Sequence, residues 1–117
     1  MTVKECYEII GANYEEVESR LRTEERIKKF LLKVLNDKSY DLLCDSIKQK
    51  NMEEAFRAAH TLKGISQNLS LTTLYESSNL LSEELRENQE YNKQAEELFE
   101  QVKKDYIHIT ETIKNLL

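Results

Sequence analysis

The residues best suited to carry out chemistry surround His60. They lie in a stretch whose apolar spacing predicts a helix over about residues 52–69. At 100° per residue, the small and apolar side chains of this helix gather on one arc, which predicts its buried face. His60 lies roughly 160° from the centre of that arc, so its imidazole is expected to point at solvent. The residues of the predicted buried face are Ala55, Ala58, Ala59, Leu62, Ile65, Ser66 and Leu69.

Three neighbours of His60 on the exposed side of this helix are hard to explain by folding alone. Gly64, one turn later, occupies a helix interior, where Gly costs about 1 kcal/mol relative to Ala, and it leaves one side of the ring uncrowded. Phe56, one turn earlier, puts an aromatic ring on a polar face, and Lys63 can bring an ammonium group beside the imidazole. Open space and a flanking cation suit an imidazole that accepts, holds and releases a phosphoryl group.

Further polar residues share the face of His60. Gln67, Arg57 and Glu53 fall within about 60° of it on the helical wheel. Phe56 and Arg57 are candidate partner contacts, although Phe56 could equally pack against a neighbouring helix and Arg57 could be an ordinary solvated charge.

Composition and charge bound the class of protein. The chain has 117 residues, which predicts one domain over 1–117, and it holds two Gly and no Pro. Such a composition excludes phosphate-binding loops and dinucleotide fingerprints, disfavours hairpin-rich β folds and favours an all-α domain. The net charge of −5 argues against binding to nucleic acid, and no apolar run approaches the ~20 residues that span a bilayer.

The N-terminus and the cysteines bear on location and cofactors. The first ten residues do not have the pattern of a secretory signal. Cys6 and Cys44 stand alone in helical patterns and form at most one disulfide rather than a framework; two lone thiols in an acidic chain without a secretory signal indicate a reducing cytoplasm. The two His and two Cys residues are too dispersed to predict a metal site. We therefore expect no cofactor.

Cap residues and apolar spacing predict seven helices. In the fourth of them, Leu42, Leu43 and Ile47 are expected to face inward. The last four helices have short connections, which predict an up-and-down four-helix bundle over about 39–116, with short N-terminal helices over about 3–36 on one end or side of it. The predicted helices are one after a Thr2–Glu5 capping box and closed by Gly11, one after Asn13, one over 24–36, one over 39–50, one over 52–69, one from Thr73 to about 87, and one from about 91 to the C-terminus.

The run from Ala59 to Gly64, followed by Asn68 and Leu69, resembles the signature of the histidine-containing phosphotransfer (HPt) domains of two-component phosphorelays. That signature reads A-H-x-L-K-G, followed by N-L and usually Gly. The chain departs from it at Ser70, which stands where Gly is usual and which we expect to cap the next helix. The resemblance covers about residues 24–116 in helix pattern, and its specific part is short.

The resemblance implies a four-helix bundle in which His60 receives a phosphoryl group from the aspartate of a receiver domain and passes it to another receiver. It implies that Lys63 steadies the phosphate, that Gly64 lets the partner approach, and that Gln67 is a polar residue near the phosphate. The implied partners are receiver domains and a hybrid histidine kinase. The receiver supplies the aspartate and Mg²⁺, and this chain is a phosphocarrier rather than an enzyme with an ATP site.

Two alternatives stay open from the sequence. The chain could be the phosphorylatable domain of a chemotaxis-type histidine kinase, with ATP bound to a separate domain, or a helical adaptor without phosphate chemistry. The dimerisation domain of an ordinary sensor kinase is disfavoured, because the Pro that typically follows its His is missing from the chain. The polar outer faces of the predicted helices favour a monomer.

Overall fold

The computed structural model describes residues 1–88 and 90–117, and these residues form seven α-helices. The all-α prediction is confirmed. The seven helices are α1 (Val3–Ile9), α2 (Tyr14–Leu21), α3 (Glu24–Val34), α4 (Ser39–Lys48), α5 (Met52–Asn68), α6 (Thr72–Glu87) and α7 (Lys93–Lys114).

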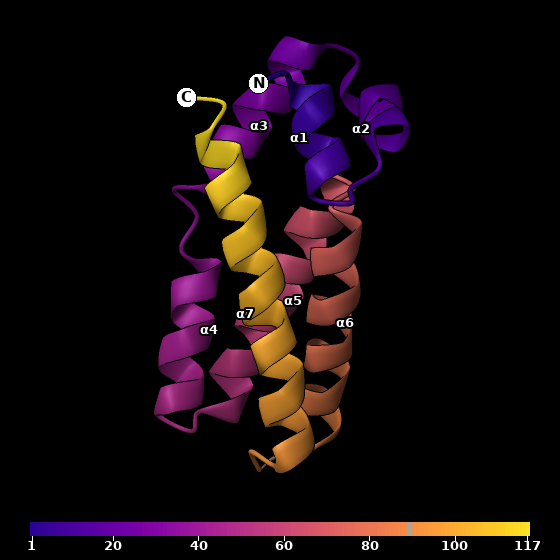
Figure 1. The fold of residues 1–117 in the computed structure, drawn as a ribbon. Helices are drawn as coiled ribbons and strands as arrows, with labels where there is room; N and C mark the ends of the chain where they lie inside the picture. The colour runs from indigo at the N-terminus through magenta and orange to yellow at the C-terminus, as the bar shows by residue number, and fades with distance from the viewer. Residues whose placement is uncertain (89) are drawn as a thin grey trace.

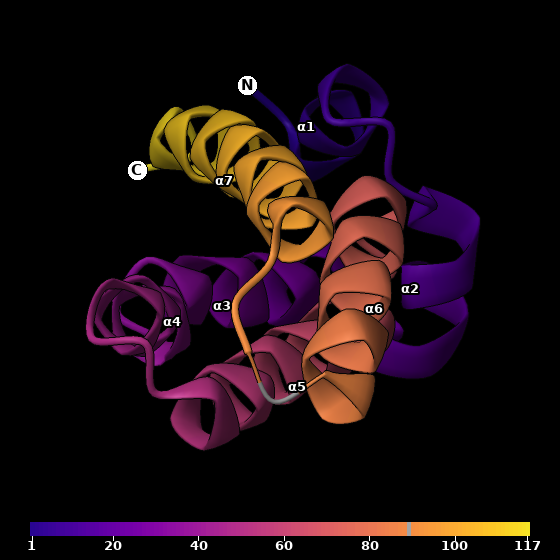
Figure 2. The same cartoon turned by 90° about the horizontal axis from the view of Figure 1, so that it is seen from below.

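Helices α4 to α7 form the up-and-down bundle, in which each helix runs antiparallel to the next along the chain (Figure 1). Helix α5 packs against α4 and α6, and α6 packs against α7. Seen along the bundle axis, the four helices surround a common centre (Figure 2). Helices α1 to α3 cover the end of the bundle at which α5 stops and α7 reaches the C-terminus. The predicted bundle with additional N-terminal helices is therefore confirmed.

Polar side chains begin most of these helices. The oxygen of Thr2 accepts a hydrogen bond from the backbone N–H of Glu5, whose carboxylate accepts one from the N–H of Thr2, which is the predicted capping box. The side-chain oxygens of Asn13 and Asn51 cap α2 and α5 by accepting from the backbone N–H of Glu16 and of Glu54, without a return bond. The predicted start of α6 at Thr73 is wrong.

Helix α6 begins at Thr72, and the buried Leu71 stands at its cap position without a capping side chain. The physical reason is the tight turn from α5, in which the N–H of Leu71 donates to the Ser66 carbonyl at 2.8 Å. That bond and the one from Ser70 N–H to the Gln67 carbonyl form the Schellman motif that ends many helices. The geometry of the preceding turn therefore decides where α6 starts.

The core is built from aliphatic side chains of the bundle together with residues of α1 to α3. Leu43 is fully buried as expected and Ile47 is half-buried, but Leu42 is 57% exposed. The prediction that Leu42 faces inward is therefore wrong. Helix α4 is buried along the stripe of Ser39, Leu43 and Ser46, and Leu42 lies outside that stripe. The helices that pack against α4, rather than its own periodicity, select the stripe.

Helices α5 and α6 pack against each other, and both bury small residues. Ala55, Ala58 and Ala59 of α5 are buried, and so are Ser77 and Ser78 of α6. The hydroxyls of the two serines donate to backbone carbonyls of their own helix, so they add no unpaired polar group to the core. Small side chains let two helices approach closely, which gives the helix that carries His60 a firm support.

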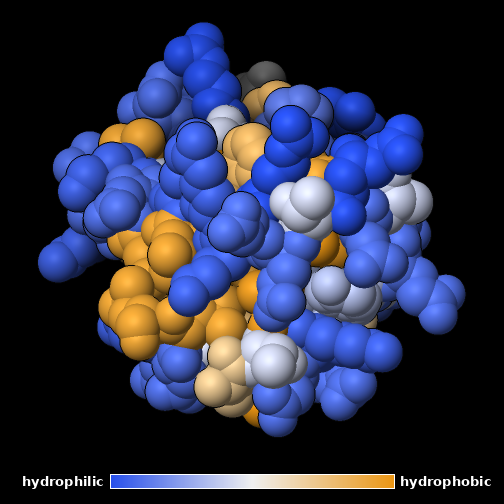
Figure 3. Space-filling model, turned by 90° about the horizontal axis from the view of Figure 1, so that it is seen from above, coloured by the Kyte–Doolittle hydropathy of each residue, from blue (hydrophilic) through white to orange (hydrophobic). Residues whose placement is uncertain are grey.

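The end of the molecule that carries α1 to α3 has a largely hydrophilic surface, with hydrophobic side chains gathered on one side (Figure 3). None of the described helices has the length and apolar character needed to cross a membrane.

Candidate functional site

His60 lies near the middle of α5 and is exposed to solvent. The face opposite to it is the buried one: Ala55 and Ala59 are fully buried, and Leu62 retains 2% exposure. Ile65 is half-buried at the edge of this face. The helical phase predicted from the sequence is therefore confirmed, and the imidazole is accessible to a partner.

Phe56 supports one side of the imidazole. Its ring stacks on that of His60 with 5.8 Å between ring centroids and 26° between ring planes. Phe56 is itself half-buried and packs against the hydrophobic core. Packing against the core therefore holds Phe56 where it limits the rotation of the His60 ring.

Gly64 leaves the opposite side of His60 open. Gly64 is exposed, and a Cβ atom added to it would meet no atom within 4 Å outside its own helix. Its backbone is helical, whereas Gly11 is the glycine with a positive φ, at 65°. Neither crowding nor backbone conformation in the folded chain requires glycine at this position. The reason for a glycine at position 64 is accordingly to be sought in function.

Cations and polar groups flank the imidazole. Lys63 is half-buried, and Gln67 is exposed two turns after His60 on the same face. Arg57 donates to Glu53 at 2.9 Å and to Glu54 at 2.8 Å, so its guanidinium is held toward the start of α5, away from His60. Phe56 thus stacks on the imidazole, Lys63 and Gly64 follow His60 within about one turn of α5, and the charge of Arg57 is engaged by Glu53 and Glu54.

Helix α6 contributes residues beside Phe56 that the sequence did not indicate. A hollow beside Phe56 is lined by Lys50 and Glu53 near the start of α5 and by Leu85 and Arg86 near the end of α6. Because α6 runs antiparallel to α5, its last turn lies beside the first turn of α5. No local pattern in α6 identifies Leu85 and Arg86 as neighbours of Phe56.

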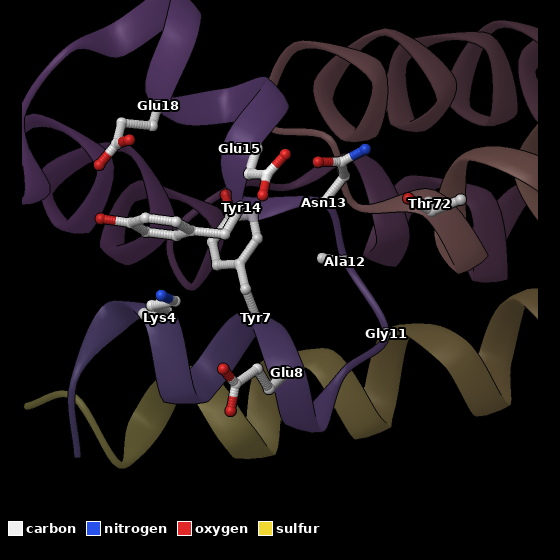
Figure 4. Close-up of a pocket in the computed structure, with 10 residues that line it drawn as sticks. All are labelled: Lys4, Tyr7, Glu8, Gly11, Ala12, Asn13, Tyr14, Glu15, Glu18 and Thr72. Atoms are coloured by element: carbon white, nitrogen blue, oxygen red, sulfur yellow. The ribbon is translucent and has the colours of Figure 1, made fainter.

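A large open pocket lies away from His60, between α1, α2 and the start of α6 (Figure 4). The acidic side chains of its lining are Glu8, Glu15 and Glu18, and Lys4 lies among them. Within the described residues, no group of three or more His, Cys, Asp or Glu side chains is arranged to hold a metal ion. Cys6 and Cys44 are both free thiols, and burial raises the pKa of each.

One further prediction from the sequence has an outcome here. Ser70 was expected to cap α6, and this is wrong: Ser70 is buried in the left-handed region with φ of 54°, after the end of α5. A left-handed residue at this point of a Schellman motif is usually Gly, which explains why the HPt signature has Gly there. His108 is exposed, and its Nε2 lies 3.3 Å from the Ile9 carbonyl oxygen, which fits a structural role.

The site is thus an exposed imidazole, stacked on Phe56, in the middle of a helix of an all-α bundle. The family model of the Hpt domain matches residues 16–116, and the chain belongs to this family. Its role is accordingly phosphotransfer in two-component signalling, with receiver and kinase domains as the kinds of partner. Neither a curated protein nor a solved structure matches the chain.

Proposed function

We propose that His60 is the phosphoacceptor of this domain, receiving a phosphoryl group from a receiver-domain aspartate and passing it to a second receiver. The observation that carries the proposal is the solvent-facing imidazole, which rests on Phe56 and has open space over Gly64. A partner aspartate can approach along that open side. In this role the chain is a carrier, and the receiver supplies the aspartate and Mg²⁺.

The transfer is an exchange of one bond at phosphorus. The unprotonated ring nitrogen of His60 attacks the phosphorus of the aspartyl phosphate, so that a P–N bond forms while the P–O bond to aspartate breaks. The aspartate leaves as a carboxylate, and the other ring nitrogen keeps its proton. The second receiver reverses these steps, and its carboxylate forms the new P–O bond while His60 leaves as neutral imidazole.

The neighbours of His60 have distinct proposed roles. The Lys63 ammonium offsets the negative charge of the bound phosphoryl group, since charge-assisted hydrogen bonds are the stronger kind. Gly64 clears the approach of the partner, and Gln67 offers a polar group at the edge of the phosphoryl site. Phe56 and Arg57 contact the receiver around the point of transfer.

The test is transfer of labelled phosphate from a panel of phosphorylated receiver domains. We expect label on the wild-type chain that is stable in base and lost in acid, as a phosphoramidate is. His60→Gln should take no label and keep its helical content by circular dichroism, because the ring points away from the core. His108→Gln is the matched control, an exposed helical histidine on α7 that should leave labelling unchanged.

Label on a serine, a threonine or His108, or label that persists in His60→Gln, would contradict the proposal. Label that comes only from an ATP-bound kinase domain, with no transfer from any receiver, would favour the chemotaxis-type alternative. A chain that exchanges no phosphate with either donor would behave as a helical adaptor.

A further inference from the structure

Helices α1 and α2 hold the end of the helix that carries His60. Within α5 the last carbonyls have no partner further along the helix. The Asn68 carbonyl accepts from Arg20 at 3.0 Å, the Leu69 carbonyl from the Tyr7 hydroxyl at 2.7 Å, and the Ser70 carbonyl from the N–H of Asn13 at 3.0 Å. In Figure 4 the Tyr7 side chain points from α1 toward the start of α2. Three consecutive carbonyls are thus bound by a part of the chain 48 to 62 residues away.

Arg20 makes the largest share of these contacts. Its guanidinium also donates to the Gln67 carbonyl at 3.0 Å and to the Ser70 hydroxyl, and that hydroxyl donates to Glu16 at 2.8 Å. The planar fork of Arg can bind several acceptors at once in fixed directions, which an ammonium cannot do. Its positive charge also suits the carbonyl end of a helix. The Ser70 side chain is therefore anchored on α2, which holds this residue in its left-handed conformation.

The contact of Arg20 with the end of α5 bears on the His60 site because Gln67 takes part in both. Its backbone oxygen is bound by Arg20, and its exposed side chain leaves α5 on the face of His60. We propose that Arg20 is a positioning residue for phosphotransfer, which fixes the last turn of α5 and thereby holds the Gln67 side chain at the edge of the phosphoryl site. This inference rests on the proposed function of His60. The Hpt family match begins at residue 16, so Tyr7 and Asn13 lie outside it.

The experiment measures transfer at saturating phospho-receiver for Arg20→Ala, Gln67→Ala and the double variant. We expect each single change to slow transfer on the order of tenfold, since small misplacements of a positioning group have effects of this size or more. The double variant should be no slower than either single one, because Arg20 acts through Gln67. Arg26→Ala, which removes an exposed arginine of α3, is the matched control and should transfer at the wild-type rate.

A second variant separates positioning from stability. Gly adopts φ of 54° without an anchoring hydroxyl, so adding Ser70→Gly to Arg20→Ala should recover much of the lost melting temperature. Transfer should stay slow in this pair, because the Gln67 and Asn68 carbonyls still lack the guanidinium. If Arg20→Ala alone is too unstable to assay, transfer is measured in the variant that also carries Ser70→Gly.

Several results would overturn the inference. These are wild-type transfer in Arg20→Ala or in Gln67→Ala, effects that multiply in the double variant, and transfer that recovers together with stability in the Ser70→Gly pair. A wild-type chain that takes no label contradicts the proposed function and this inference with it. A labelled wild type with unaffected Arg20→Ala contradicts this inference alone.

Discussion

Gly64 offers the sharpest separation of stability from function in this domain. It lies in the interior of α5 and is exposed, and an added Cβ would meet nothing within 4 Å outside its own helix. Gly64→Ala should therefore gain the full difference in helix propensity and unfolded-state entropy, about 0.5–1 kcal/mol. For a domain of this size that free energy corresponds to a rise in melting temperature of roughly 2–5 °C.

Gly64→Gln should be at least as stable as the wild type, because Gln is nearly as good a helix former as Ala and has room at this position. Function should respond differently. The Cβ atoms of residues one turn apart on a helix are about 5–6 Å from each other, so the long Gln side chain would occupy the space above His60. We expect transfer to fall at least about tenfold, because the receiver aspartate can no longer align with the imidazole.

The assay pairs thermal unfolding, followed by circular dichroism, with label transfer from a phospho-receiver. Gly64→Ala is the matched control, with higher stability and nearly normal transfer. Wild-type transfer in Gly64→Gln would refute the access argument. Unfolding of Gly64→Gln would contradict the expectation that the exposed position of Gly64 tolerates a long side chain.

Two further changes test Lys63, one turn after His60, and Tyr7, which binds the chain just after the end of α5. Lys63→Ala should slow transfer or shorten the lifetime of the phosphohistidine, because Arg57 is held by Glu53 and Glu54 and does not replace the lost charge. The free energy of unfolding of this variant should change by only about 0.5 kcal/mol. Unchanged transfer and lifetime would show that Lys63 is only a solvated neighbour. Tyr7→Phe removes the hydroxyl that donates to the Leu69 carbonyl, which should lower the free energy of unfolding, measured in urea, by about 1–3 kcal/mol. A change near zero would show that this buried hydrogen bond makes no net contribution to stability.

Local patterns were enough to predict much of this domain. The shortage of Gly and Pro predicted the helices, and side chains such as Thr2 and Asn51 marked where two of them begin. The solvent-facing position of His60 followed from the phase of α5 alone, because burial of one face of a helix directs the opposite face outward. The family resemblance likewise depends on a short contiguous run of residues. Each of these features involves groups within a turn or two of one another.

Tertiary structure decided the features that depend on distant neighbours. Leu42 has the spacing of a core residue yet is exposed, because the helices packed on α4 cover another stripe of it. Tyr7 reaches the Leu69 carbonyl, and Arg20 binds the end of α5 and the Ser70 hydroxyl, across 47 to 62 residues of chain. A periodicity records which face of a helix is apolar, and a cap motif records a bond within one turn. Neither records which helix covers that face or which distant donor reaches the last carbonyls, since these depend on how the helices pack.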